Sequence, residues 1–261
     1  MTDTIAHHPE TQGDDHSPAA ERIGYFRFAL QILTVALAYI MGAAILTAPA
    51  LLMGEPTTER TSFWAALSSP AGALAGVFVA WLWLRKSGRF KEAMGLVPMD
   101  STKRMLALAA LATGVTIAIF QIGGNASEAM GLESPAVDSV IGLATASPAL
   151  FALWIVGVAW IGAGFGEEVL WRGFLMDRLQ HLPGIGGSMP VALVVQAIIF
   201  GLAHFYQGWS GVLITGCVGL LMGWIRLTSR GSIWAAVIAH GAVDTIMLSL
   251  AYAGELGWYN G

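Results

Sequence analysis

Carboxylates and imidazoles are concentrated in three short motifs in the second half of the chain, each inside or beside a long apolar run. In chain order the motifs consist of Glu167, Glu168 and Arg172; Phe200 and His204; and His240 and Asp244. Placing a charge inside a bilayer costs about 3 kcal/mol on insertion scales, so an ionisable residue there is a functional candidate. Peptide hydrolysis needs an activated water and a donor for the tetrahedral oxyanion, and acids with histidines can supply both.

The first motif offers a general base. On a helix, Glu168 and Arg172 share a face and can form an ion pair. Glu167 points about 100° away and is free to face the interior of a helix bundle. Partly desolvated and beside a second carboxylate, Glu167 could act as the general base that activates water. The alternative is that the two acids only cap the span at the cytoplasmic interface.

The other two motifs offer imidazoles that could assist. Phe200 and His204 lie on one helical face, and His204 could hold the water on which Glu167 acts. His240 and Asp244 also share a face, and the carboxylate could orient the imidazole so that His240 donates to the oxyanion. Each histidine has a structural alternative, namely a hydrogen-bonded core histidine for His204 and a structural His–Asp hydrogen bond for His240.

A divalent metal is a second version of the same chemistry. Glu167, His204 and His240 could bind zinc, since two histidines and one carboxylate form a known catalytic zinc set. The residues leave both versions open, and we favour the metal-independent water. Another protease design is suggested by Gly208-Trp209-Ser210-Gly211, which matches the Gly-x-Ser-Gly of rhomboid serine proteases. Gly and Ser are ordinary at an inter-helix turn, so we expect Ser210 to lie away from the site.

The elements that must position these residues are transmembrane helices. Of the 261 residues, 56% are hydrophobic and 11% charged, whereas a soluble domain carries about 25% charged residues. About 20 apolar residues cross a bilayer core. We expect spans at about 28–54, 61–84, 105–127, 139–166, 189–206, 211–226 and 231–253. The predicted fold is an all-α polytopic membrane protein with about seven transmembrane helices in one bundle, after a disordered cytoplasmic tail at 1–22.

Depth in the membrane brings the three motifs together. If the fourth helix continues to about Gln180, then Glu167, His204 and His240 lie about 20, 22 and 14 Å from the inner ends of their helices. All three therefore reach the middle of the membrane. Three unrelated structural roles for ionisable residues at the same depth are less plausible than a single site that uses all three.

Basic residues predict the orientation. Twelve of the 13 Lys and Arg residues fall in the tail or in loops on the tail's side of a seven-span chain, and only Arg60 falls on the other side. This bias predicts a cytoplasmic N-terminus and an external C-terminus. The single cysteine, Cys217, excludes a disulfide framework.

The order Glu-Glu-x-x-x-Arg, Phe-x-x-x-His, His-x-x-x-Asn/Asp resembles the CPBP intramembrane proteases, which include type II CAAX prenyl endopeptidases and bacteriocin-processing or immunity proteins. The match covers about residues 150–250, with the protease core at about 150–252. Asp244 stands where eukaryotic members tend to have Asn.

The resemblance implies an intramembrane endopeptidase, metallo- or glutamate-dependent, that acts on membrane-associated or lipidated substrates. The implied location is a bacterial inner membrane. The implied partners are the lipid bilayer and a peptide or protein substrate, with no nucleic acid. The catalytic residues would be Glu167, Glu168, His204, His240 and Asp244, supported by Arg172 and Phe200. The alternatives from other classes are a proton-relay transporter and a catalytically silent membrane scaffold of the same fold.

Overall fold

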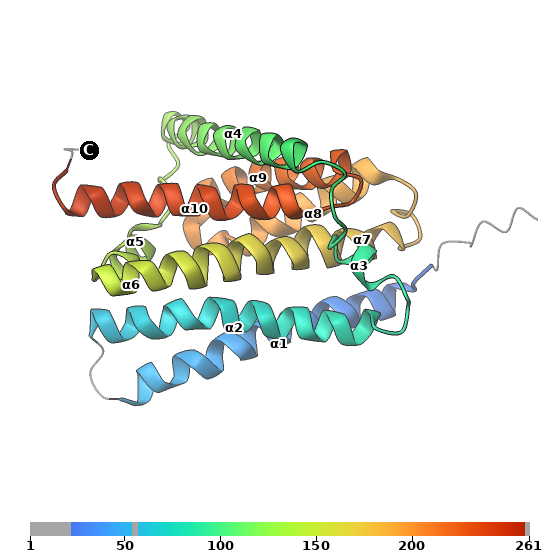
Figure 1. The fold of residues 1–261 in the computed structure, drawn as a ribbon, viewed down its shortest axis with the longest axis horizontal. Coiled ribbons are helices and arrows are strands. Elements are labelled where there is room, and N and C mark those ends of the chain that lie inside the picture. The colour runs from blue at the N-terminus through green and yellow to red at the C-terminus, as the bar shows by residue number, and fades with distance from the viewer. Residues whose placement is uncertain (1–21, 54–56, 259–261) are drawn as a thin grey trace, which may run out of the picture.

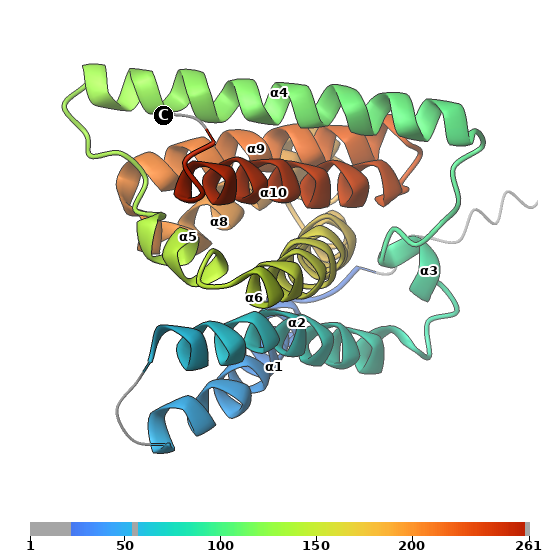
Figure 2. The same ribbon diagram turned by 60° about the vertical axis from the view of Figure 1, so that its left-hand side comes forward.

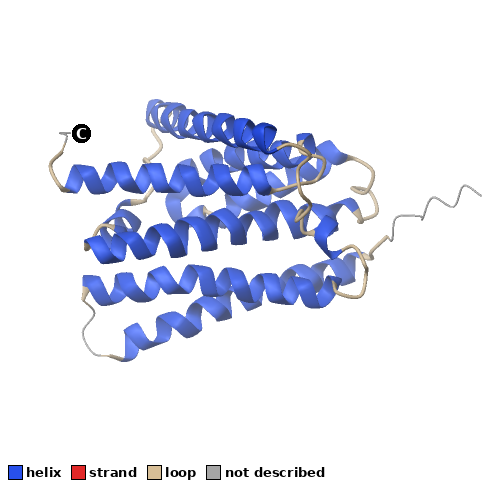
Figure 3. Ribbon diagram, in the orientation of Figure 1, coloured by secondary structure: helices blue, strands red, loops and turns tan. Residues whose placement is uncertain are grey.

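The computed structural model describes residues 22–53 and 57–258, and every regular element among them is helical (Figure 3). The elements are α1 (Tyr25–Leu52), α2 (Thr58–Leu84), α3 (Phe90–Ala93), α4 (Thr102–Ala129), α5 (Asp138–Ala144), α6 (Pro148–Leu153), the π-helix η1 (Trp154–Leu175), α7 (Met176–Gln180), α8 (Met189–Ala203), the 3₁₀-helix η2 (Phe205–Gln207), α9 (Gly208–Thr228) and α10 (Trp234–Glu255). The predicted all-α class is confirmed. Apart from Arg22, the predicted tail lies outside the described residues.

Six helical segments of the described chain are long and apolar enough to cross a membrane, and α8 is a shorter apolar helix. The six segments are Tyr25–Ala50, Thr58–Leu84, Thr102–Ala129, Pro148–Gln180, Phe205–Thr228 and Trp234–Glu255. Successive long helices run in alternate directions, and α8 continues the alternation (Figure 1). As a result, the start of α1 and the end of α10 lie at opposite ends of the bundle.

The fourth span lies between two groups of helices. The α1–α2 hairpin packs on one side of η1 and α10 packs on the other, while α4 covers α9 and α10 from outside (Figure 2). This arrangement puts the helix that carries Glu167 and Glu168 in the middle of the bundle. All three motif-bearing helices therefore lie on the same side of the α1–α2 hairpin.

The fourth span differs from the α-helix that its sequence suggests. The predicted span was 139–166, but α5 ends at Ala144 and the fourth span begins only at Pro148. The continuation to about Gln180, on which the depth argument depended, is present, because α6, η1 and α7 run without a break to that residue. Within it, the 22 residues of η1 form a π-helix. π-Helical turns are rare and are frequently found at functional sites. Both glutamates of the first motif therefore lie in a helix that is wider than a regular α-helix.

Small residues let the neighbouring helices approach η1. A Cβ added at Gly164 would lie 3.2 Å from the backbone nitrogen of Gly241 and 3.2 Å from the carbonyl oxygen of Val237. On the opposite side, Gly162 faces Ser69 and Gly166 faces Ala73, both on α2. The glycines of η1 thus allow both α2 and α10 to pack closely against the part of η1 that precedes the glutamates.

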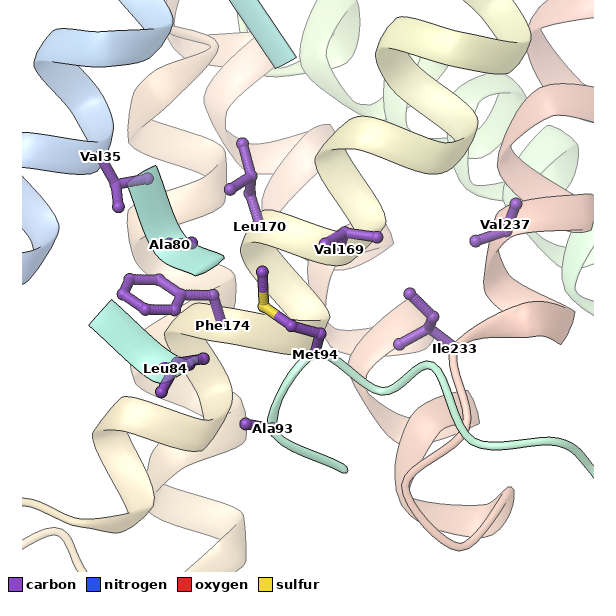
Figure 4. Packing of buried hydrophobic residues seen from close by; sticks show 10 residues of the cluster. All are labelled: Val35, Ala80, Leu84, Ala93, Met94, Val169, Leu170, Phe174, Ile233 and Val237. Atoms are coloured by element: carbon purple, nitrogen blue, oxygen red, sulfur yellow. The ribbon is translucent and has the colours of Figure 1, made fainter. Parts of the chain in front are cut away.

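A buried apolar cluster fixes the helices just below the motifs (Figure 4). Its members come from α1, α2, α3 with the residue after it, η1 and α10; they are Val35, Ala80, Leu84, Ala93, Met94, Val169, Leu170, Phe174, Ile233 and Val237. Val169 and Leu170 directly follow Glu168 in η1, and Val237 precedes His240 by one turn of α10. Packing of these side chains therefore sets the relative position of Glu168 and His240.

The end of α8 corrects one predicted boundary. The sequence predicts a helix to about residue 206, but α8 ends at Ala203 and η2 follows after His204. The backbone N–H of His204 donates to the carbonyl of Gly201 at 2.9 Å, which tightens the last turn. Gly208 then turns the chain into α9 with φ +81°, a conformation that glycine adopts without steric cost. His204 consequently lies at a helix end rather than inside a helix.

Candidate active site

The carboxylate of Glu168 joins the first and third motifs. Its Oε1 accepts a hydrogen bond from Nη1 of Arg172 at 2.9 Å and another from Nδ1 of His240 at 2.8 Å. The side chains of Glu168 and Arg172 are both fully buried. The ion pair that the four-residue spacing predicts is therefore confirmed, and it binds α10 to η1 at the level of the motifs.

Arg172 extends the contact to the second motif. Its guanidinium carbon lies 4.0 Å from the ring centroid of Phe200, a cation–π distance, and the ring of Phe200 lies 4.6 Å from that of His204. Trp171 meets the edge of Phe200 with centroids 5.5 Å apart. A continuous chain of contacts thus runs from His240 through Glu168, Arg172 and Phe200 to His204.

The orientation of His240 differs from the predicted one. We expected Asp244 to hold the imidazole, but its Oδ2 lies 4.0 Å from Nε2, which is too long for a hydrogen bond. Glu168 holds the ring instead, through Nδ1. The close packing of α10 on η1 brings the fully buried Glu168 carboxylate to the ring. Nε2 of His240 is left as the ring nitrogen that can meet a substrate, with Asp244 near it.

The carboxylate of Glu167 lies among the residues of the three motifs and has one oxygen without a partner. The residue is half-buried, and its Oε2 is buried without a hydrogen-bond partner among the described residues. The carboxylate acts electrostatically on groups from four elements, namely Arg172, His240, Asp244, Tyr39 and Tyr206. Glu167 therefore faces the bundle interior, as its offset from Glu168 on the helix predicts.

The tautomer of His204 follows from its one fixed hydrogen bond. Nδ1 lies 2.9 Å from the carbonyl oxygen of Phe200, which can only accept, so Nδ1 carries the proton. In the neutral ring, Nε2 is then the acceptor. A half-buried imidazole with a free acceptor nitrogen can take a hydrogen bond from water.

The comparison with protein families agrees with this geometry. Residues 148–246 match the family model described as type II CAAX prenyl endopeptidase Rce1-like. This segment of the chain is similar to that family, and we call it the Rce1-like domain. It contains every residue of the three motifs, and the resemblance seen in the sequence is confirmed for this segment. Searches of curated proteins and of solved structures gave no match.

Sequence reasoning missed one neighbour of the site in the Rce1-like domain. The ring of Tyr206 lies 5.8 Å from that of His204 and is tilted by 31° to it. Its hydroxyl accepts a hydrogen bond from Nε2 of Gln207 at 3.0 Å, and the residue is 65% exposed. Tyr206 therefore covers His204 at the bundle surface. Its place two residues after His204 was the only signal in the sequence.

The donor set of the Rce1-like domain does not fit the zinc site that we considered. Among the described residues, no group of three or more His, Cys, Asp or Glu side chains is placed to hold a metal ion. In both His204 and His240 the bonded nitrogen is Nδ1, so Nε2 is the atom that each ring could offer to a metal. A catalytic zinc site needs three protein ligands converging on one point. No step proposed below uses a metal.

Ser210 has a structural role outside the motif contacts. It is 2% exposed, and its hydroxyl donates to the carbonyl oxygen of Glu133 at 2.6 Å. This bond ties the start of α9 to the loop before α5. The serine of the Gly-x-Ser-Gly sequence thus has a structural role, which is to fix the turn before α9 to this loop.

Proposed function

We propose that this chain is an intramembrane endopeptidase that cleaves membrane-associated or lipidated substrates, with Glu167 activating the water. At the level of the family, the Rce1-like domain belongs to CAAX-protease-like intramembrane endopeptidases. The observation that carries the residue assignments is the unbroken contact chain between the three motifs. Separate structural roles for the acids and histidines would not require them to meet.

Glu167 and His204 supply the activated water. Oε2 of Glu167 is buried and unpaired, which leaves it free to take a proton. Nε2 of His204 is an acceptor because Nδ1 donates to Phe200, so this nitrogen can hold the second proton of the same water. The contacts of Phe200 with Arg172 and with the tilted ring of His204 keep the imidazole in place at the end of α8.

His240 supplies the oxyanion donor. Glu168 fixes the ring through Nδ1, and Nε2 of the imidazolium can donate to a developing negative charge. The carboxylate of Asp244, 4.0 Å from Nε2, offsets the positive charge of the ring. Arg172 holds Glu168 and does not reach the substrate, since it is fully buried.

The reaction then balances without a further reactant. Glu167 removes one proton from water, and the oxygen attacks the scissile carbonyl carbon to form a tetrahedral oxyanion held by His240. When the C–N bond breaks, the protonated Glu167 returns its proton to the leaving amine. The products are a carboxylic acid and an amine, and Glu167 is again ionised. The proton of the new carboxylic acid then passes to the amine, which leaves a carboxylate and an ammonium group.

The location and orientation form part of the proposal. The chain is a multi-pass membrane protein with six long apolar helices and one shorter one among its described residues. We propose a bacterial inner membrane, with the N-terminus cytoplasmic and the C-terminus external, on the basis of the twelve-to-one distribution of basic residues. The proposed partners are the lipid bilayer and a peptide or protein substrate.

Cleavage by the purified protein tests the function. In the first experiment, the protein in lipid nanodiscs is given a farnesylated fluorogenic peptide that ends in a CAAX sequence. In the second, proteomics compares the membrane peptides of wild-type cells with those of a Glu167→Gln strain. We expect a set of membrane peptides that depends on Glu167. Glu255→Gln is the matched control, because Glu255 is an exposed glutamate at the end of α10.

The outcomes separate the proposal from its alternatives. Products that vanish in Glu167→Gln and persist in Glu255→Gln support an endopeptidase. Identical peptide sets in wild type and Glu167→Gln would favour the silent scaffold. Proton flux in liposomes without any cleavage would favour the proton-relay transporter.

A further inference from the structure

A buried arginine outside the three motifs binds main-chain carbonyls with every nitrogen of its guanidinium. Arg226 lies in the last turn of α9. Its Nη1 donates to the carbonyl oxygens of Arg172 and of Gly173, the latter at 3.2 Å. Its Nε donates to the carbonyl of Gly231 at 3.3 Å, and its Nη2 donates to that of Glu92 at 3.5 Å. Arg226 therefore joins the end of η1 to α3 and to the loop before α10.

The carbonyl of Arg172 needs a partner because of the way in which η1 ends. A π-helix bonds each N–H to the carbonyl five residues earlier, whereas an α-helix uses the carbonyl four residues earlier. The N–H of Met176 donates to the carbonyls of Trp171 and Gly173 and passes over that of Arg172. The next N–H, that of Asp177, lies in α7, and the four-residue count pairs it with Gly173. The change of helix type thus leaves the carbonyl of Arg172 out.

Arg226 supplies the bond that this change leaves open. A buried carbonyl without a partner costs free energy comparable to that of a lost hydrogen bond. Arg172 is thus held at both ends, its carbonyl by Arg226 and its guanidinium by Glu168. Arg226 also holds Gly231, which lies three residues before the start of α10, the helix that carries His240. One side chain therefore fixes both the helix of Glu168 and the helix of His240.

We propose that Arg226 is a positioning residue of the site, which fixes the point where the π-helix gives way to α7 and so keeps Glu168 within hydrogen-bond distance of His240. Without a donor for the carbonyl of Arg172, the change of helix type is free to move along the chain, and the side chains of η1 then turn about the helix axis. The effect on catalysis rests on the proposed function, whereas the hydrogen bonds of Arg226 and His240 do not.

Solid-state NMR of the full chain in lipid bilayers tests the bond to η1 in the wild type. The main-chain carbonyl carbons of arginine are labelled with ¹³C and the guanidinium nitrogens with ¹⁵N, so that a strong dipolar coupling reports a guanidinium bonded to an arginine carbonyl. We expect one such coupling, lost in Arg226→Lys and kept in Arg104→Lys. Arg104 is the matched control, because it donates to the carbonyl of Thr228 at 2.8 Å. A wild-type spectrum without the coupling would overturn the proposal.

The nitrogen signals of histidine test the consequence for the site. The Nδ1 signal that is absent from His240→Gln belongs to His240, and its position depends on the hydrogen bond to Glu168. We expect Arg226→Met to move this signal and Arg104→Met to leave it in place. Arg226→Lys should keep it near its wild-type position, because Nη1 alone bonds both carbonyls of η1 and an ammonium nitrogen has three protons to donate.

A His240 signal that stays in place in Arg226→Met would refute the positioning role. If Arg226→Met does not fold, Arg226→Gln decides in the same way, because its side chain is uncharged and shorter than that of arginine. An unmoved His240 signal in that variant would count equally against the proposal.

Kinetics of the same variants on the farnesylated peptide give a further readout. A misplacement of about 1 Å at a site can cost about 10²-fold in rate. We expect Arg226→Met to lower kcat by about 10²-fold with KM unchanged. Arg226→Lys should recover most of the rate, and Arg104→Met should leave both constants unchanged. A wild-type kcat in Arg226→Met would contradict the role of Arg226. If the wild type cleaves nothing, the proposed function fails, and the NMR signals still decide the bonds of Arg226 and His240.

Discussion

Nδ1 of His240 lies 2.8 Å from Oε1 of Glu168, two atoms whose residues are 72 positions apart in the chain. The same oxygen accepts from Arg172 at 2.9 Å. Glu168 is therefore shared between an arginine of its own helix and a histidine of α10. Oε2 is buried without a partner among the described residues in both Glu167 and Glu168, so what distinguishes Glu168 is that its Oε1 is held by Arg172 and His240.

The first prediction separates stability from activity at Glu168. Glu168→Gln leaves Arg172 as an uncompensated buried charge, which typically costs about 3 to 5 kcal/mol. We expect a large drop in the thermal midpoint of the protein in nanodiscs. Replacing both partners, Glu168→Gln with Arg172→Met, should restore much of the stability because the buried charge is removed with its partner.

Activity should not return in the double variant, since His240 has lost the carboxylate that orients it. A Glu168→Gln protein as stable as the wild type would contradict the role of this ion pair. Recovery of cleavage together with stability would show that His240 does not need Glu168.

The predictable part of the fold follows from a local requirement. A bilayer demands about 20 apolar residues for each span, so charge-free runs reveal spans directly. The existence of the spans was predicted for this reason, and the i, i+4 pair of Glu168 and Arg172 was predicted because it depends only on residues of one helix. The bounds of the fourth span were not, since its charge-free run covers 139–166 whereas the helix runs from Pro148 to Gln180. The end of α8 was not, since the tightened turn at His204 and the positive φ of Gly208 depend on how α8 meets α9.

The site was only partly predictable. Helical spacing and depth brought the three motifs together, but the partner of His240 depends on how closely α10 approaches η1. That approach is possible because Gly164 and Gly241 have no side chains where the two helices meet. Glycines in a sequence do not reveal which residues of one helix will face which residues of another.

A second prediction concerns that close approach. Gly164→Ala should destabilise the protein by about 1 to 3 kcal/mol, the usual cost of overpacking, because the new Cβ would meet backbone atoms that cannot move aside. Thermal unfolding in nanodiscs measures the effect. Gly114→Ala on α4 is the matched control, because a Cβ at position 114 has no atom within 4 Å. Equal stabilities for the two variants would contradict the packing of α10 on η1.

A third prediction concerns orientation. Reporter fusions after Arg104 and after Gly261 should report opposite sides of the membrane, because an odd number of spans follows from counting α8 as a crossing. The reporter after Arg104 should be cytoplasmic, in agreement with the basic residues. Two reporters on the same side would reject the crossing by α8.

A fourth prediction concerns Glu167. Glu167→Gln keeps the shape of the side chain but cannot take a proton, so cleavage should fall about 10² to 10⁴-fold. The thermal midpoint should stay near that of the wild type, because Oε2 of Glu167 makes no bond that the variant would lose. Ser210→Ala should change the rate little, since Ser210 bonds only to the loop carbonyl of Glu133. Full activity in Glu167→Gln would move the assignment to another residue.

The last prediction separates a glutamate-activated water from a metal. Among the described residues, no three His, Cys, Asp or Glu side chains converge in a way that could hold a metal ion. We therefore expect cleavage of the farnesylated peptide to survive exhaustive chelation, with no stoichiometric zinc in the purified protein by elemental analysis. A metal held by only three protein ligands is removable, if slowly, so prolonged dialysis against chelator is a fair test. The opposite outcome is that chelation abolishes cleavage and that added zinc restores it in the wild type but not in His204→Ala. That outcome would show instead that Glu167, His204 and His240 converge on a metal when substrate binds.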